Sequence, residues 1–278
     1  MFTLYLVLCT INSCKKDEPD TETTSVTDNS IAEGEFSRIF PQANGIAVGD
    51  SGVQYQKGGQ FPIPANYCPD HWLADTVFPK TMWIEYGADT TGDGIFDYGC
   101  IGNDGKYRKG KIQAVFGSPW SINGYNVTMN LVDYFVNGIR YEGTISVTKN
   151  SPASFTQTVT NGKCTGSGYT ISWNSSRTIT LTVNPLDPNA DVATIAGTAS
   201  GTDRNGKTFS VDITTPLRRA MACCWIVSGT MTLKLEGKKD RTIDFGNGTC
   251  DNRAKLIIAG NEFEFELEYN ISFERINN

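Results

Sequence analysis

The chain has 278 residues and a formal net charge of −6, a length that allows one large β domain or two small ones. Hydrophobic residues make up 39% of it, which supports a sizeable core and excludes a globally disordered chain. Residues 15–35 hold seven acids against two lysines, so the rest of the chain is nearly neutral. This distribution of charge lacks the excess of Lys and Arg that is typical of a nucleic-acid-binding protein.

The N-terminus carries an export signal. The apolar run 2–8 is too short to cross a bilayer, which takes roughly 20 residues, but it fits the core of a signal peptide. Residues 11–14 (INSC) follow, and the composition then changes at once to KKDE. This order resembles a lipobox, which implies removal of residues 1–13, diacylglycerol on the Cys14 thiol and acylation of the new amino terminus. A plain secretory signal with an incidental cysteine is the alternative.

The residues after Cys14 predict the destination of the lipoprotein. Lys15 stands at the second mature position, where an aspartate would retain a lipoprotein in the inner membrane. A lysine followed by two acids also resembles the surface-export signal of Bacteroidetes lipoproteins. We therefore expect a protein anchored in the outer membrane by lipid on Cys14. The face of that membrane stays open, and the lysine and acids after Cys14 favour the outer face.

Residues 14–35 are predicted to be an acidic flexible tether, because the stretch 19–29 is rich in Thr, Asp and Ser. Residues 30–33 (SIAE) form a capping-box pattern that could start a short helix ending near Pro41. Continued tether is the alternative interpretation of the same residues.

Residues 36–278 are predicted to be an all-β body. From 262 to 274 apolar and polar residues alternate, which puts one face of a long strand on a core and the other in water. In the stretch 126–149, two strand-like runs flank Asn137-Gly138, a pair that suits a type I′ hairpin turn. Further Asn-Gly pairs stand at 123–124, 161–162, 205–206 and 247–248. Repeated hairpins of antiparallel strands give a large curled sheet, a sandwich or a barrel.

Two segments of the body look alike, which indicates a duplicated β unit. Residues 80–87, a following cysteine and the strand 108–112 correspond to residues 240–246, a following cysteine and the strand 253–257. The body would then hold two related units, about 60–150 and 151–278. Chance similarity of short strands is the alternative.

An even number of cysteines beyond residue 14 argues for disulfides in an exported protein. They are Cys68, Cys100, Cys164, Cys223, Cys224 and Cys250. The repeat selects Cys68 with Cys100 and either Cys223 or Cys224 with Cys250, which leaves Cys164 for the remaining member of the vicinal pair. A thiolate zinc site is disfavoured, because the chain has no C-x-x-C spacing and a single histidine.

Residues 89–97 (DTTGDGIFD) resemble a calcium-binding loop, with oxygen ligands on a tightly turning backbone. The candidate ligands of a structural calcium ion are Asp89, Thr91, Asp93, the carbonyl of Ile95, and Asp97. Position 12 of such a loop should carry a bidentate carboxylate and is Cys100 here. A solvated Asp/Gly hairpin loop is the alternative.

Catalysis has little support. A Ser-His or Cys-His pair could use only His71, and a single histidine is more often an ordinary surface or packed residue. Glycoside hydrolysis needs two carboxylates at a set distance in space, which the sequence does not give. With 30 acids in the chain, some pair always looks possible, so acids alone do not indicate a glycosidase. The five tryptophans could build a carbohydrate platform, but Trp83 and Trp173 lie in strand-like runs and are expected in the core. Trp120 is the best candidate for exposure.

The ordered pattern of short motifs over residues 14–270 resembles an uncharacterised family of Bacteroidetes outer-membrane lipoproteins. The motifs are SCKKDE at 13–18, FPKT at 78–81, GNDG at 102–105, RKGKI at 108–112, YFVNG at 134–138, EGT at 142–144, ISW at 171–173, IAGT at 195–198, IDFG at 243–246 and CD at 250–251. Residues 89–97, Cys164 and the doubled Cys223-Cys224 look like additions to the family pattern.

The resemblance implies no activity. The sequence therefore predicts an exported, lipid-anchored, non-enzymatic binding or structural module of the cell envelope. The alternative is a carbohydrate-binding or glycan-processing accessory protein. Expected partners are the membrane, through the lipid on Cys14, and a glycan or an envelope protein.

Overall fold

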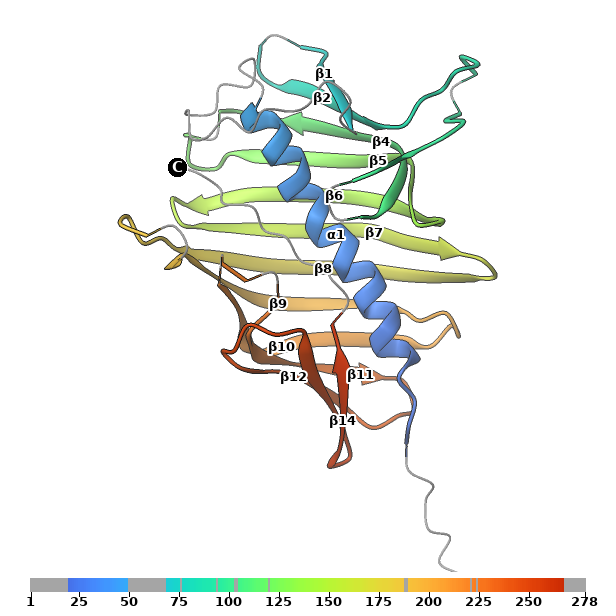
Figure 1. Ribbon diagram of the computed structural model, residues 1–278, viewed down its shortest axis with the longest axis vertical. Helices are drawn as coiled ribbons and strands as arrows, with labels where there is room; N and C mark the ends of the chain where they lie inside the picture. The colour runs from blue at the N-terminus through green and yellow to red at the C-terminus, as the bar shows by residue number, and fades with distance from the viewer. Residues whose placement is uncertain are drawn as a thin grey trace, which may run out of the picture.

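A computed structural model describes residues 20–49, 69–75, 77–93, 95–102, 105–119, 121–187, 190–220, 222–223 and 225–267. In this part of the chain one helix lies across one antiparallel sheet (Figure 1). Within the same residues no helix combines the length and the hydropathy needed to cross a bilayer.

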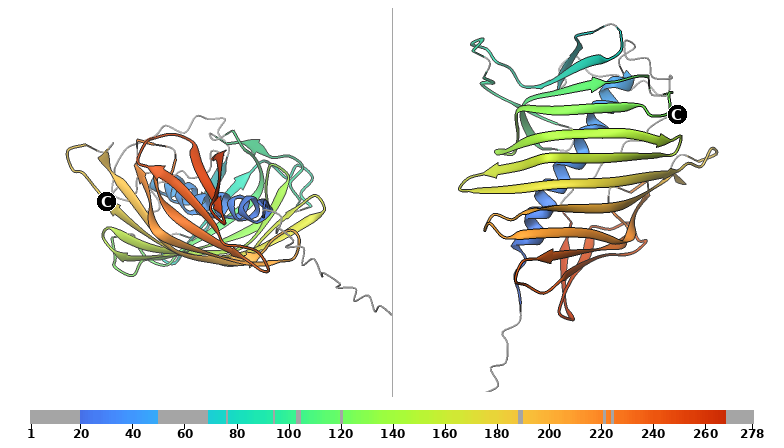
Figure 2. Two further views of the ribbon diagram at one scale, coloured as in Figure 1. Left: turned by 90° about the horizontal axis from the view of Figure 1, so that it is seen from below. Right: turned by 180° about the vertical axis from the view of Figure 1, so that it is seen from behind.

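The sheet is a meander in which strands that follow each other in sequence are hydrogen-bonded neighbours, except that β3 pairs only with β4. Its described strands are β1 (Asp70–Leu73), β2 (Lys80–Tyr86), β3 (Cys100–Ile101), β4 (Tyr107–Phe116), β5 (Asn126–Val136), β6 (Ile139–Ser151), β7 (Ser154–Gly166), β8 (Tyr169–Thr182), β9 (Val192–Thr202), β10 (Thr208–Ala220), β11 (Ser228–Leu235), β12 (Arg241–Asn247), β13 (Arg253–Ile258) and β14 (Asn261–Glu266). The sheet curls around the helix without closing (Figure 2). The predicted all-β class with one N-terminal helix is confirmed, in the form of a curled sheet.

One Asn-Gly pair forms the predicted two-residue hairpin turn, three stand at longer connections between strands, and one is not in a turn. At 123–124, 205–206 and 247–248 only the glycine has positive φ. Asn137 and Gly138 both have positive φ (48° and 82°), as a type I′ turn requires, and they join β5 to β6. Asn161-Gly162 instead forms a bulge inside β7, so the turn expected there is wrong. Glycine is needed in this bulge because a Cβ on Gly162 would lie 2.1 Å from the carbonyl oxygen of Trp173.

The alternating C-terminal segment is a strand as far as it is described. β14 pairs with β13, and Phe265 and Leu267 pack against the core. Residues 268–274 of the predicted strand lie outside the described residues.

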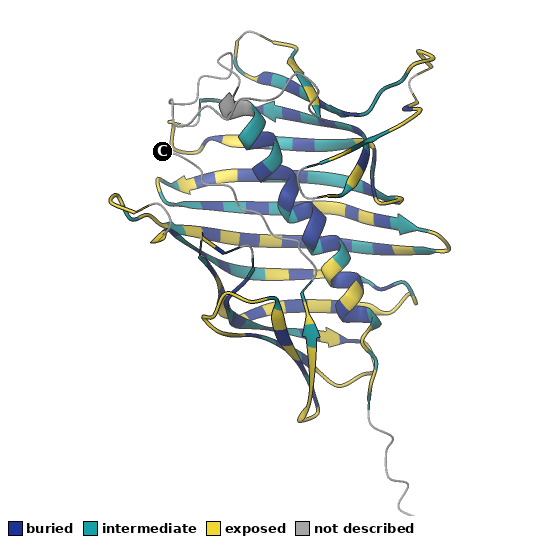
Figure 3. Ribbon diagram, viewed as in Figure 1, coloured by how far each residue is buried: buried dark blue, intermediate teal, exposed yellow. Residues whose placement is uncertain are grey.

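The helix α1 (Thr24–Gly49) lies on the concave face of the sheet, and most of its residues between Ser25 and Asn44 are buried (Figure 3). Phe36 stacks on Trp173 with parallel rings 5.5 Å apart, and Trp173 donates its Nε1–H to Asn29 at 2.9 Å. Phe40 packs on Phe155 one turn further on. Burial of these large side chains is the main source of hydrophobic stabilisation for the helix.

The helix is longer at both ends than the sequence predicted. It begins at Thr24, where the Glu22 carboxylate accepts hydrogen bonds from the backbone N–H and the hydroxyl of Ser25. It continues through Pro41, because packing of the flanking residues outweighs the roughly 3 kcal/mol that a proline costs inside a helix. The tether predicted for residues 14–35 is therefore wrong from residue 24 onward.

Five acids of the predicted tether pair with four arginines of the sheet, and we call these contacts the helix–sheet ion pairs. They are Asp20 and Glu22 with Arg241 (each oxygen 3.1 Å from Nη2), Asp28 with Arg204 (2.7 Å from Nε), Glu33 with Arg177 (2.8 Å from Nη2), and Glu35 with Arg108 (3.2 Å from Nη2). The acids run along the helix in the reverse of the sequence order of the arginines. Each pair therefore fixes the helix over a different part of the sheet.

The Glu35 pair is the most deeply buried of these contacts. Glu35 and Arg108 are each 1% exposed, and Tyr134 donates its hydroxyl to Glu35 at 2.7 Å. Burial and the neighbouring Glu35 carboxylate raise the pKa of Tyr134 well above its ordinary value, so the phenol keeps the proton that it donates.

The sheet runs through the predicted border between two units. Residue 150 lies in the β6–β7 hairpin, where the two strands pair directly. The two similar segments do form similar strand pairs, with Glu85 opposite Lys111 in β2–β4 and Asp244 opposite Lys255 in β12–β13. These pairs lie near opposite ends of the strand order.

Candidate functional site

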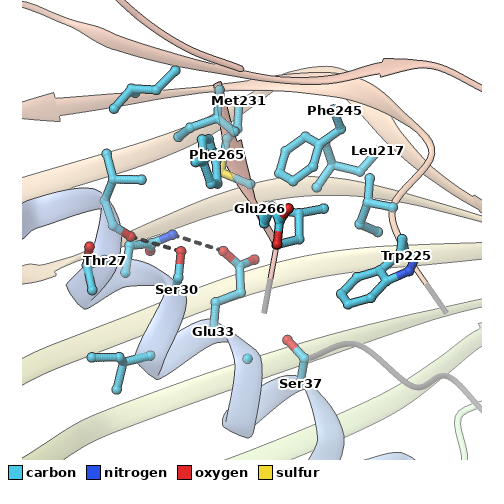
Figure 4. Close-up of a pocket in the computed structure, with 18 of the residues that line it drawn as sticks. Thr27, Ser30, Glu33, Ser37, Leu217, Trp225, Met231, Phe245, Phe265 and Glu266 are labelled. Carbon is cyan, nitrogen blue, oxygen red and sulfur yellow. Dashed lines mark hydrogen bonds between the residues drawn. The ribbon is translucent and has the colours of Figure 1, made fainter. Parts of the chain in front are cut away.

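A cavity of about 820 Å³ lies between the N-terminal half of α1 and the C-terminal strands of the sheet. Figure 4 shows side chains from both sides pointing into it. Its position follows from the curl of the sheet, which brings β10–β14 back over the first turns of the helix (Figure 2). The volume lies in the range that small-molecule ligands occupy.

Most of the sheet side of the cavity is apolar. Inward-facing residues of six strands and one loop form this apolar wall: Ile179, Ile195, Leu217, Ile226, Met231, Ile243, Phe245 and Leu256. Phe265 and Leu267 close it from β14. This wall suits a hydrocarbon chain or ring system, since it offers contact and no hydrogen bonds.

The helix side of the cavity is polar. Thr27, Ser30, Glu33 and Ser37 follow each other at helical spacing and line the cavity (Figure 4). The Ser30 hydroxyl donates to the carbonyl of Val26 at 2.9 Å, so it can still accept a hydrogen bond. The cavity is thus amphipathic, with one hydroxyl-bearing side and one hydrocarbon side.

Glu33 and Arg177 hold the polar side together. Arg177 donates Nε–H to Glu33 Oε1 at 3.0 Å, and Asn29 donates to Glu33 Oε2 at 3.1 Å. Next to Arg177, on the neighbouring strand, Gln157 donates to the backbone carbonyl of Phe36 at 3.0 Å. A carboxylate, a guanidinium and an amide therefore meet over one turn of the helix.

No catalytic arrangement is found at the cavity. His71, the only histidine of the chain, lies in β1 and is not among the residues that line it. The serines of the cavity wall therefore have no imidazole base within it.

The predicted calcium ligands lie in the exposed loop between β2 and β3, far in sequence from the cavity. Asp89 accepts from the N–H of Gly92 (2.7 Å) and Asp93 from the N–H of Ile95 (2.8 Å). Thr91 donates to Asp89, and Asp97 accepts from the N–H and the hydroxyl of Thr90.

In these contacts the side-chain oxygens of the loop accept hydrogen bonds from other residues of the same loop. The hydrogen bonds from Thr90 lower the pKa of Asp97. Among the described residues no three His, Cys, Asp or Glu side chains gather as metal ligands. The structure therefore gives no support to the calcium ion predicted at Asp89, Thr91, Asp93, Ile95 and Asp97.

The cysteines follow the prediction in part. Cys223 pairs with Cys250, one of the two partners expected for it, and Cys100 is also disulfide-bonded. Cys14, Cys68 and Cys224 lie outside the described residues. The pairing expected for Cys164 is wrong: its thiol is free and buried under the helix, and burial raises its pKa.

The tryptophans divide between core and surface. Trp173 is buried as predicted, and Trp225 lines the cavity. Trp72 and Trp83 stack at 6.3 Å at the β1 end of the sheet, where Trp72 is 41% exposed. Trp120, the predicted exposed tryptophan, lies outside the described residues.

Sequence reasoning missed the cavity. Its residues come from segments that only the curl of the sheet brings together, and no short motif marks them. One available signal was the spacing of Ala32, Phe36, Ile39, Phe40 and Ala43, which is helical and predicts a buried helix in the supposed tether.

Comparison of the chain with protein families, with curated proteins and with solved structures finds no match.

Proposed function

We propose that this protein is an exported, lipid-anchored binding protein of the cell envelope that takes an amphipathic small molecule into the cavity between α1 and the sheet. The observation that carries the proposal is the cavity itself, about 820 Å³ with an apolar wall and a polar wall. A concave, mostly apolar pocket of this size with a few polar groups is typical of sites that bind small molecules.

Adjacent residues of β11 provide a matched test of the cavity. Met231 points into the cavity, whereas Thr232 points to the opposite face of the sheet. We expect Met231→Trp to fill the cavity and weaken the binding of the neutral apolar dye N-phenyl-1-naphthylamine about ten-fold or more. Thr232→Trp should leave dye binding within about two-fold. Dye fluorescence measures both, on the full-length chain with Cys14→Ala so that no detergent is needed.

Two results would contradict the cavity as a binding site. One is the absence of dye binding to the unsubstituted protein. The other is equal binding by the Met231→Trp and Thr232→Trp proteins, which would place the dye elsewhere.

The anchor is a separate part of the proposal. It is supported by the order of the apolar run, the sequence INSC at 11–14 and the charged residues that follow, and by the resemblance to Bacteroidetes lipoproteins. Described residues begin at Asp20, at the end of the helix that meets β12. Lipid on Cys14 would therefore hold this end of the molecule close to the membrane.

We expect metabolic labelling with an alkyne analogue of palmitate to mark the protein in its native host and to leave the Cys14→Ala variant unmarked. Fractionation should place the labelled protein in the outer membrane, and protease added to intact cells should degrade it if it faces outward. An unlabelled protein that stays in the cytoplasm would refute the anchor and the export signal together.

A carbohydrate ligand is the second candidate, and the Trp72–Trp83 stack favours it. On the same convex face, Gln113, Asn130 and Thr144 continue the row beside Trp83 and are joined by hydrogen bonds. An exposed aromatic ring next to amide and hydroxyl groups is chemistry that recognises sugars. Binding on a glycan array that Trp72→Ala abolishes would favour this candidate over the cavity ligand.

A further inference from the structure

Two neighbouring side chains in the cavity wall have polar atoms without hydrogen-bond partners. Gln157 in β7 and Arg177 in β8 are direct register partners, so both project to the concave face, and both line the cavity. Each residue is only 4% exposed. Among the described residues, Gln157 Oε1 and both terminal nitrogens of Arg177, Nη1 and Nη2, are buried with no hydrogen-bond partner.

The helix contacts other polar atoms of these residues. Arg177 Nε donates to Glu33 Oε1 at 3.0 Å, and Gln157 Nε2 donates to Phe36 O. Arg177 Nη2 lies 2.8 Å from the same Glu33 oxygen as an ion-pair contact. What remains are N–H donors on Arg177 beside one acceptor on Gln157. A buried polar group without a partner is costly, so this adjacent pair points to a ligand group that accepts from one and donates to the other.

The charge of the site disfavours an ionic ligand group. Glu33 already balances the guanidinium of Arg177, so a second anion or a cation would leave a net charge beside the apolar wall. Glu264 and Glu266 of β14 also line the cavity, but both are exposed, so water screens their charges and the balance between Glu33 and Arg177 decides the head group.

We infer that the ligand is an uncharged amphiphile whose head group both accepts and donates hydrogen bonds, such as a long-chain alcohol, a monoacylglycerol or a primary amide. The head accepts from Arg177 and donates to Gln157, and the hydrocarbon part lies against the sheet wall around Met231 and Phe245. This inference rests on the proposed function, because it names the chemistry of the ligand for the same cavity.

Ligands with one chain length and different heads test the inference. Decanol, decyl methyl ether, decanoate and decyltrimethylammonium compete with N-phenyl-1-naphthylamine for the full-length Cys14→Ala protein at pH 8. We expect decanol to displace the dye at concentrations about ten-fold lower than each of the others, the factor that one ordinary hydrogen bond supplies.

Gln157→Met removes the acceptor and keeps the size of the side chain. It should reduce the preference for decanol over decyl methyl ether to within about two-fold, because the ether lacks only the donor. Gln113→Met is the matched control, since Gln113 lies on the convex face and bonds to Asn130. That control should keep the full preference. A ratio of two ligands on one variant does not depend on how much of the variant is folded.

The outcomes separate the inference from the function on which it rests. Equal displacement by all four ligands, tighter binding of decanoate or decyltrimethylammonium, or an unchanged preference in Gln157→Met would overturn the head-group assignment and leave the cavity in place. Failure of the unsubstituted protein to bind the dye, or a Met231→Trp protein that binds it normally, would overturn the proposed function instead.

Discussion

Replacing Glu35 by Gln is expected to lower the free energy of unfolding by about 3–5 kcal/mol, the usual effect of removing one partner from a buried ion pair. Glu35 and Arg108 are each 1% exposed, so the variant removes a carboxylate charge that faces a guanidinium inside the protein. The Tyr134 hydroxyl also loses the charged acceptor to which it donates at 2.7 Å. Urea-induced unfolding followed by circular dichroism measures the change.

Two companion variants show whether the charge imbalance is the cause. Glu35→Leu combined with Arg108→Met removes both charges and should recover much of the stability that the single change loses. Asp133→Asn breaks an ion pair with Arg140 in which both side chains are more than 40% exposed, and it should cost less than about 1 kcal/mol. A Glu35→Gln protein as stable as Asp133→Asn would show that the Glu35 pair is well hydrated.

Replacing Trp173 by Ala is expected to cost about 3–5 kcal/mol, as for other large aromatic residues removed from a core. The indole is 1% exposed, stacks on Phe36 and donates to Asn29, so it joins the middle of the helix to the middle of the sheet. Thermal and urea unfolding should show a single, less stable transition.

The same substitution at the sheet end is the control. Trp72→Ala removes a tryptophan that is 41% exposed and stacks on Trp83, and we expect a loss of about 1 kcal/mol or less. Trp173→Phe should keep the ring stacked on Phe36 and lose about 1 kcal/mol with the hydrogen bond. Similar losses for Trp173→Ala and Trp72→Ala would mean that the helix contributes little to the stability of the sheet.

Local sequence signals predicted the parts of the fold that depend on neighbours in the chain. Alternation and Asn137-Gly138 identify a hairpin because turn and strand pattern lie within 24 residues of each other. Asn161-Gly162 failed because the same dipeptide also suits a bulge, and the choice between bulge and turn depends on Trp173 across the sheet.

The helix and the cavity depend on contacts that no local pattern shows. Asp28, Glu33 and Glu35 resemble a solvated tether until their arginines are known, and those lie 73 to 176 residues away. An acid next to other acids is usually hydrated, so composition favoured disorder. The cavity also depends on the curvature of the sheet. That curvature is set by bulges and twist in many strands at once, so no single segment of the sequence predicts it.

The reversed order of the helix–sheet ion pairs has a consequence for how the chain reaches its native state. The helix is made first, but the arginine that holds its first turn, Arg241, lies in β12 and is among the last residues to emerge. Contacts of this span give a high relative contact order, which slows folding. A chain that emerges N-terminus first therefore cannot complete its fold before nearly all of it is available.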